Sequence, residues 1–298
     1  MTTKVLIFTD LDGSLLDHFS YSFDKAKPLL ALLKEMNIPV IPVTSKTRAE
    51  LSVLRRELDS DEPFVVENGA AVFVPEDYFA TPPSGCISVD NYYCAQFSLS
   101  RDHWLTLLAE LRVEFDGEFE SFTSLGVEGI KACTGLSDDA AQLANIREFS
   151  EPVKWRGSDS RKLLFVQKLR QAGATVLQGG RFLHITGACN KGKALQWLYE
   201  QYQNLTPSEG KSGRFLTIAA GDGDNDVDML QVADCAVVIR SPVHEPLKIE
   251  HENIYRTQQT GPDGWVEGVS WFLGAAERPL EMNSIEYLRK KLRSNFYG

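Results

Sequence analysis

The sequence contains no Cys-x-x-Cys pair and no run of about 18 apolar residues that could cross a bilayer. Its five cysteines are scattered along the chain, and their odd number argues against a disulfide framework or a zinc site. No apolar signal-like segment precedes the first expected strand, and no internal repeat is present. These absences predict a cytoplasmic protein with reduced cysteines.

An excess of positive charge is also lacking, since 31 Lys and Arg residues face 41 Asp and Glu residues, for a formal net charge of −10. This balance argues against nucleic acid or an anionic membrane as the main partner. It leaves room for a small anionic substrate, because local cations or a bound metal can reverse the field at one site. With 298 residues, 43% of them hydrophobic, the chain is expected to form one large or two smaller globular domains.

The first apolar run, residues 5–8, leads directly to two carboxylates one residue apart, Asp10 and Asp12. Such a run is typical of a buried strand in a parallel sheet, and ligands bind beyond the carboxyl ends of these strands. Gly13 allows the chain to turn sharply there. An isolated Asp-x-Asp-Gly sequence is equally compatible with a polar turn that closes a strand. The choice between the two interpretations depends on which residues follow the other strands.

Three more apolar segments end in polar residues. Residues 40–43 precede Thr44, Ser45 and Lys46, residues 64–66 precede Glu67 and Asn68, and residues 215–220 precede Asp222, Asn225 and Asp226. Helices are expected between them at 26–36, 48–58 and 191–203, and Lys191 begins the last of these. The alternation predicts an α/β fold with a doubly wound parallel sheet.

The alternation stops at the Pro/Gly/Ser-rich residues 81–85 and resumes near residue 188. Between these points we expect strands at 92–97, 115–122 and 153–155, a hairpin at 174–185, and helices at 101–111, 138–146 and 161–172. The pattern predicts an α+β domain over residues 84–187, inserted into a core formed by residues 1–83 and 188–298. Residues 279–298 are expected to form a surface helix with a solvated basic patch.

The polar residues at the strand ends suit phosphoryl chemistry. Carboxylates from two strands can hold Mg²⁺, and a hydroxyl and a lysine beside it can bind a phosphoryl group. One Asp can act as the nucleophile, and a second carboxylate two residues later can act as general acid and then base.

The motifs Asp10-x-Asp12-Gly13-Ser14, Thr44, Lys191 and Gly221-Asp222-x-x-Asn225-Asp226 resemble, in the same order, those of haloacid-dehalogenase-type phosphohydrolases. The insert resembles the α/β cap of their Cof-type branch. The resemblance implies a Rossmann-like core with Asp10 as nucleophile and Asp12 as general acid and base. It also implies that Asp10, the Asp12 carbonyl and Asp222 hold Mg²⁺ with support from Asp226, and that Thr44 and Lys191 hold the phosphoryl oxygens.

Further stretches, at residues 44–50, 67–70, 180–184 and 256–265, are similar to mannosyl-3-phosphoglycerate phosphatases. This resemblance implies release of phosphate from a small sugar-glycerate phosphate, giving mannosylglycerate. Ser45, Lys46, Asn68 and Arg181 are the expected substrate-binding residues, whereas His184 is equally compatible with a structural role.

Several alternatives stay open. The same chemistry can act on glucosyl-3-phosphoglycerate, sucrose phosphate or another sugar phosphate. A phosphomutase and a non-catalytic phospholigand-binding protein are weaker alternatives. The intact Asp10, Asp12, Lys191 and Asp222 argue against the binding protein, because a degenerate motif would be expected there. We expect no nucleic-acid or membrane partner, and a homodimer is compatible with the sequence.

Overall fold

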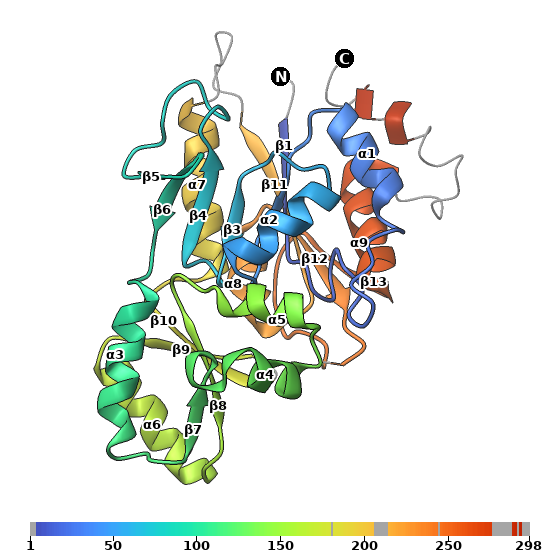
Figure 1. The fold of residues 1–298 in the computed structure, drawn as a ribbon. Coiled ribbons are helices and arrows are strands. Elements are labelled where there is room, and N and C mark those ends of the chain that lie inside the picture. Colours follow the sequence, from blue (N-terminus) through green and yellow to red (C-terminus); the bar gives the residue numbers. More distant parts are fainter. Residues whose placement is uncertain are drawn as a thin grey trace.

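The computed structural model describes residues 4–179, 181–205, 214–243, 245–275, 288–290 and 292–293. At its centre is a five-stranded sheet in the order β13-β12-β11-β1-β2, in which all neighbours are parallel (Figure 1). Its strands are β1 (Lys4–Thr9), β2 (Val40–Pro42), β11 (Phe215–Gly221), β12 (Cys235–Arg240) and β13 (Ile254–Thr260). The predicted α/β fold with a parallel sheet is therefore confirmed.

Helices cover both faces of this sheet. One face packs against α1 (Lys27–Glu35), α2 (Arg48–Glu57) and α9 (Gly261–Ser270), and the other against α7 (Lys191–Leu205) and α8 (Val227–Val232). Within β1, Val5 and Ile7 join the first apolar cluster, and Leu6 and Phe8 join the second. Residues 5–8 of β1 are buried on both sides of the sheet, and they form an unbroken apolar run.

A second group of strands, in the order β3-β4-β6-β5, extends the core and is antiparallel throughout. It contains β3 (Phe64–Val66), β4 (Ala71–Pro75), β5 (Ile87–Val89) and β6 (Tyr92–Gln96), and a parallel bridge between Val43 and Val65 joins it to the chain after β2. The strand expected at 92–97 therefore belongs to the core and not to the inserted block, because β6 pairs along the whole of β4. We propose that the inserted domain begins near residue 98, after β6, instead of at residue 84.

The inserted part has its own antiparallel sheet in the order β7-β8-β10-β9, drawn below the core in Figure 1. Its strands are β7 (Phe119–Ser121), β8 (Glu151–Trp155), β9 (Thr175–Gly179) and β10 (Phe182–Thr186). Helices α3 (Arg101–Arg112) and α6 (Asp159–Gln171) cover one face through an apolar cluster that contains Trp104 and Phe165. Helix α4 (Phe122–Thr134), which the sequence analysis did not predict, packs on Phe182 of β10 together with α5 (Asp138–Asn145).

The C-terminal segment is described only in part. Leu288 and Leu292 are buried in the cluster that includes α1, and Arg289 forms an ion pair with Glu35 at 2.7 Å. The rest of the helix expected at 279–298 lies outside the described residues. No helix within the described ranges is long and apolar enough to span a bilayer.

Candidate active site

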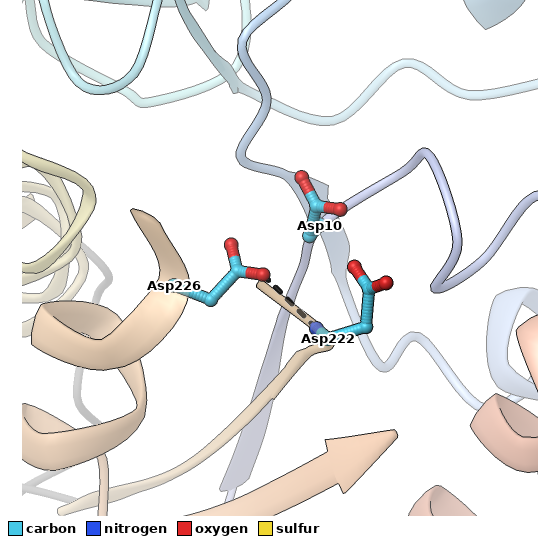
Figure 2. Close-up of side chains that lie close together, drawn as sticks. All are labelled: Asp10, Asp222 and Asp226. Atoms are coloured by element: carbon cyan, nitrogen blue, oxygen red, sulfur yellow. Dashed lines mark hydrogen bonds between the residues drawn. The ribbon is translucent and has the colours of Figure 1, made fainter. Parts of the chain in front are cut away.

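Three carboxylates meet where β1 and β11 end side by side. The pairing of the two strands ends at Thr9 and Ala220, so Asp10 and Asp222 leave the same edge of the sheet. The amide of Asp10 donates to the carbonyl of Ala220 at 2.8 Å. Asp226 ends the short 3₁₀ helix η1 (Asp224–Asp226), and one oxygen from each carboxylate lies within 4.8 Å of the others (Figure 2).

A fully buried lysine at the start of α7 donates hydrogen bonds to two of these three carboxylates. The Nζ atom of Lys191 donates to Asp10 Oδ1 at 2.5 Å and to Asp226 Oδ1 at 2.6 Å. The second oxygen of Asp226 accepts from the amides of Asp222 and Gly223, both at 3.0 Å, and Figure 2 shows the first of these bonds. Asp226 therefore fixes both the lysine and the turn that carries Asp222.

The charges of the site favour a cation. Burial and the charge of Asp226 raise the pKa of Asp10 well above its usual range, Lys191 lowers it, and Asp222 raises it further. Although burial favours the neutral amine, Asp10 and Asp226 raise the pKa of Lys191. Three buried carboxylates beside one lysine leave negative charge uncompensated, and the donors are all oxygen. This set fits a hard divalent cation such as Mg²⁺.

Two glycines allow the loops to approach this closely. Gly13 has φ +83°, and a Cβ atom there would lie 2.6 Å from Asp222 Oδ2. Gly69 has φ +90°, and its Cβ would lie 2.1 Å from the carbonyl oxygen of Asn190, the residue before Lys191. Any larger residue at either position would be strained and would also push a loop of the site away.

Asp12 lies beside the carboxylate group but has a different partner. Its Oδ2 atom is 2.8 Å from Nζ of Lys46, which is also 3.9 Å from Glu50 Oε1. The Oδ1 atom of Asp12 is buried and has no hydrogen-bond partner among the described residues. Lys46, which the sequence assigned to substrate binding, therefore contacts the expected general acid directly.

The other predicted site residues lie either in loops that follow core strands or in a hairpin of the inserted part. Thr44 is buried and its Oγ1 accepts from the amide of Lys46 at 3.2 Å, while the adjacent Ser45 lies on the same loop. Asn68 Oδ1 accepts from Asn225 Nδ2 at 3.0 Å, which joins the loops after β3 and β11. Arg181 instead lies in the hairpin between β9 and β10 and donates to the carbonyl of Cys133 in α4 at 2.6 Å. A substrate contact by Arg181 stays a prediction.

One buried arginine near the site was missed from the sequence. Arg147 lies in the loop between α5 and β8, and its Nη2 donates to the carbonyl of Ser45, 102 residues earlier in the chain, at 2.9 Å. No local pattern marks this residue, because its role depends on how the inserted block folds back onto the core.

The sequence of this chain is similar to those of known proteins. A family model described as haloacid dehalogenase-like hydrolase matches residues 7–81, and one described as sucrose-6F-phosphate phosphohydrolase matches residues 162–273. A protein of Methanococcoides burtonii, named glucosyl-3-phosphoglycerate/mannosyl-3-phosphoglycerate phosphatase, is 37% identical over 274 residues. That alignment covers 91% of this chain and 98% of the relative.

Solved structures resemble the whole arrangement of core and insert. A haloacid dehalogenase-like hydrolase from Bacteroides thetaiotaomicron superimposes with a TM-score of 0.60 and 18% identity, over 90% of this chain and 97% of that one. A sugar phosphatase of haloacid dehalogenase subclass IIB gives a TM-score of 0.53 and 15% identity, over 85% and 94% of the two chains. At these identities the similarity establishes the fold.

Proposed function

Because the chain belongs to the haloacid dehalogenase-like hydrolases and is a phosphoric monoester hydrolase, we propose that it removes phosphate from mannosyl-3-phosphoglycerate. The observation that carries the proposal is the meeting of Asp10, Asp222 and Lys191 at one sheet edge. The name of the Methanococcoides relative, which aligns over 91% of this chain, supports the choice of substrate class. Since that name also includes glucosyl-3-phosphoglycerate, this ester is the second candidate.

In the proposed reaction, a carboxylate oxygen of Asp10 attacks phosphorus and forms an aspartyl-phosphate. The bond between phosphorus and the glyceryl oxygen breaks, and Asp12 donates its proton to that leaving oxygen. Asp12 then takes a proton from a water molecule whose oxygen attacks the same phosphorus. The bond between Asp10 and phosphorus breaks, phosphate leaves, and both carboxylates return to their initial states.

The neighbours of these groups have supporting roles. Lys191 orients Asp10 through its 2.5 Å hydrogen bond, and its ammonium group and the hydroxyl of Thr44 would donate hydrogen bonds to the phosphoryl oxygens. Asp10, Asp222 and the carbonyl of Asp12, supported by Asp226, would hold Mg²⁺, which when bound supplies positive charge to the phosphoryl group. We assign Mg²⁺ as the cofactor because all the donors are oxygen.

The sugar-glycerate part of the substrate is proposed to contact Ser45, Lys46, Asn68 and Arg181. Ser45, Lys46 and Asn68 follow core strands, whereas Arg181 belongs to the inserted domain, which would cover the substrate and exclude water. The five cysteines are all unpaired, which supports the cytoplasm as the proposed compartment.

The test is the rate of phosphate release, with Mg²⁺ and with an EDTA control, from a panel of esters. The panel contains mannosyl-3-phosphoglycerate, glucosyl-3-phosphoglycerate, sucrose 6-phosphate and simple hexose phosphates. We expect the highest kcat/KM for the mannosyl ester. A higher value for a hexose phosphate or sucrose 6-phosphate would overturn the proposed substrate while leaving the reaction class intact.

A further inference from the structure

Glu67 is a strand-end carboxylate that does not join the group formed by Asp10, Asp222 and Asp226. It is buried and faces the inserted block, where its carboxylate accepts three hydrogen bonds. The donors are the amide of Glu148 at 2.8 Å, the amide of Phe149 at 3.3 Å and the hydroxyl of Ser150 at 2.6 Å. Buried main-chain amides need such partners, so Glu67 fixes the path of residues 148–150.

The positive partner of Glu67 reaches back to the active-site loop. Arg147 is buried, with its Nε 3.4 Å from Glu67 Oε2 and 3.1 Å from the hydroxyl of Ser150. Its Nη2 donates to the carbonyl of Ser45 at 2.9 Å. The planar guanidinium can make these contacts together, which a single ammonium group cannot.

The turn that carries Glu67 is bonded to the same loop. Glu67, Asn68 and Gly69 have φ values of +50°, +62° and +90°, so two residues with side chains are held in the left-handed region. The amide of Glu67 donates to the carbonyl of Lys46 at 3.0 Å, and that of Asn68 to the carbonyl of Thr44 at 2.9 Å. Strained turns of this kind persist when several contacts determine them.

We propose that Glu67 and Arg147 are positioning residues for the phosphatase reaction. Together they tie the loop of residues 44–46 to residues 147–150 of the inserted block. In this way they hold the hydroxyl of Thr44 and, through Lys46, the carboxylate of Asp12 where the reaction needs them. This inference rests on the proposed roles of Thr44, Lys46 and Asp12.

A nearby ion pair provides a matched control. Arg101 lies 2.5 Å from Glu151 through Nε, and its Nη1 donates to the carbonyl of Asn145 at 2.6 Å. Like Arg147, it pairs with a buried carboxylate and also binds a main-chain carbonyl. In the described part of the chain, no hydrogen bond or ion pair links Arg101 to residues 44–46.

The experiment compares Arg147→Lys with Arg101→Lys in the full-length protein. Each change keeps the positive charge and removes the second contact of the guanidinium. We would measure Tm, kcat and KM for p-nitrophenyl phosphate and for the mannosyl ester, and the inhibition constant of vanadate, an anion that mimics the phosphoryl group. Ser150→Ala is the milder second variant, because it removes the hydroxyl between Glu67 and Arg147 without removing a charge.

For Arg147→Lys we expect kcat to fall on the order of 10- to 100-fold on both substrates, because small displacements of catalytic groups cost that much. Vanadate should also bind more weakly. We expect the two variants to have similarly lowered Tm values, because each loses one contact of a buried ion pair. Arg101→Lys should leave kcat within about two-fold, since it displaces no catalytic group.

Equal kcat values in the two variants would overturn the inference, and so would an unchanged kcat in Ser150→Ala if Arg147→Lys does not fold. An inactive wild type would instead refute the proposed function.

Discussion

The ammonium nitrogen of Lys46 lies 2.8 Å from Oδ2 of Asp12. Although burial favours the neutral amine, the charges of Asp12 and Glu50 raise the pKa of Lys46, so the lysine is charged at neutral pH. The contact orients one oxygen of Asp12 while the other has no hydrogen-bond partner among the described residues. Lys46 therefore has a place beside the proposed general acid, in addition to the substrate contact proposed for it.

Replacing Lys46 by Met should impair the step in which the leaving oxygen is protonated. A sugar-glycerate oxygen needs this proton much more than p-nitrophenolate does. We expect kcat to fall on the order of 10- to 100-fold for the mannosyl ester, within the range of general acid catalysis, and much less for p-nitrophenyl phosphate. The matched control is Lys34→Met, because Lys34 forms an exposed ion pair with Asp59 and lies near the end of α1, before β2, whereas the site loop follows β2. An equal fall on both substrates would contradict the role beside Asp12, and so would a higher KM for the mannosyl ester with an unchanged kcat, because that is the result of losing a substrate contact alone.

Gly13→Ala should weaken metal binding, because the added Cβ would lie 2.6 Å from Asp222 Oδ2. Gly85→Ala is the control, since Gly85 also has a positive φ, +75°, but an added Cβ would meet no atom within 4 Å. Both changes carry the left-handed backbone cost of about 1–2 kcal/mol. We expect the Mg²⁺ concentration for half-maximal activity to rise on the order of 10-fold in Gly13→Ala alone. The same Mg²⁺ requirement in both variants would show that Asp222 does not hold the metal.

His184 should make the protein less stable in acid. Burial and the charge of Arg147 lower the pKa of this side chain to about 3, below the ordinary value of 6.5. Between these two pH values the unfolded chain binds a proton that the folded protein does not. The contribution of this residue to the free energy of unfolding is therefore fully present above pH 6.5. It declines as the pH falls toward 3, by at most about 1.4 kcal/mol per pH unit.

The measurement is urea unfolding of the wild type and His184→Gln at several pH values from 7 to 4. Carboxylates titrate in both proteins, so the difference between the two isolates the histidine. We expect the free energy of unfolding of the variant to fall less steeply with acid. Parallel curves would show that His184 is protonated in the folded protein.

The sequence was informative where burial on both sides of a strand leaves a largely apolar run, as in β1 and β11, and where polar residues follow these runs. Asp10, Thr44 and Asp222 could be located in this way. Helix α4 could not, because it contains Gly126 and Gly129 and depends on the packing of Phe122 against Phe182.

Contacts between distant parts of the chain were the other limit. The bond from Arg147 to Ser45 and the pairing of β6 with β4 arise only once the chain has folded. The ion pair between Lys46 and Asp12 is of the same kind, since both residues were predicted at the site but their contact was not. Strand-end patterns indicate which residues share an edge of the sheet, but not which side chains pair there.

Asp10 is proposed as the nucleophile of a metal-dependent phosphatase. The most direct test is the rate of phosphate release from mannosyl-3-phosphoglycerate with Mg²⁺, measured for the wild type and for Asp10→Asn after circular dichroism has shown that both are folded. We predict release by the wild type and a loss on the order of 10⁴-fold or more in the variant. No release by the wild type would contradict the phosphatase activity, and a folded Asp10→Asn variant with substantial activity would contradict the role of Asp10 as nucleophile.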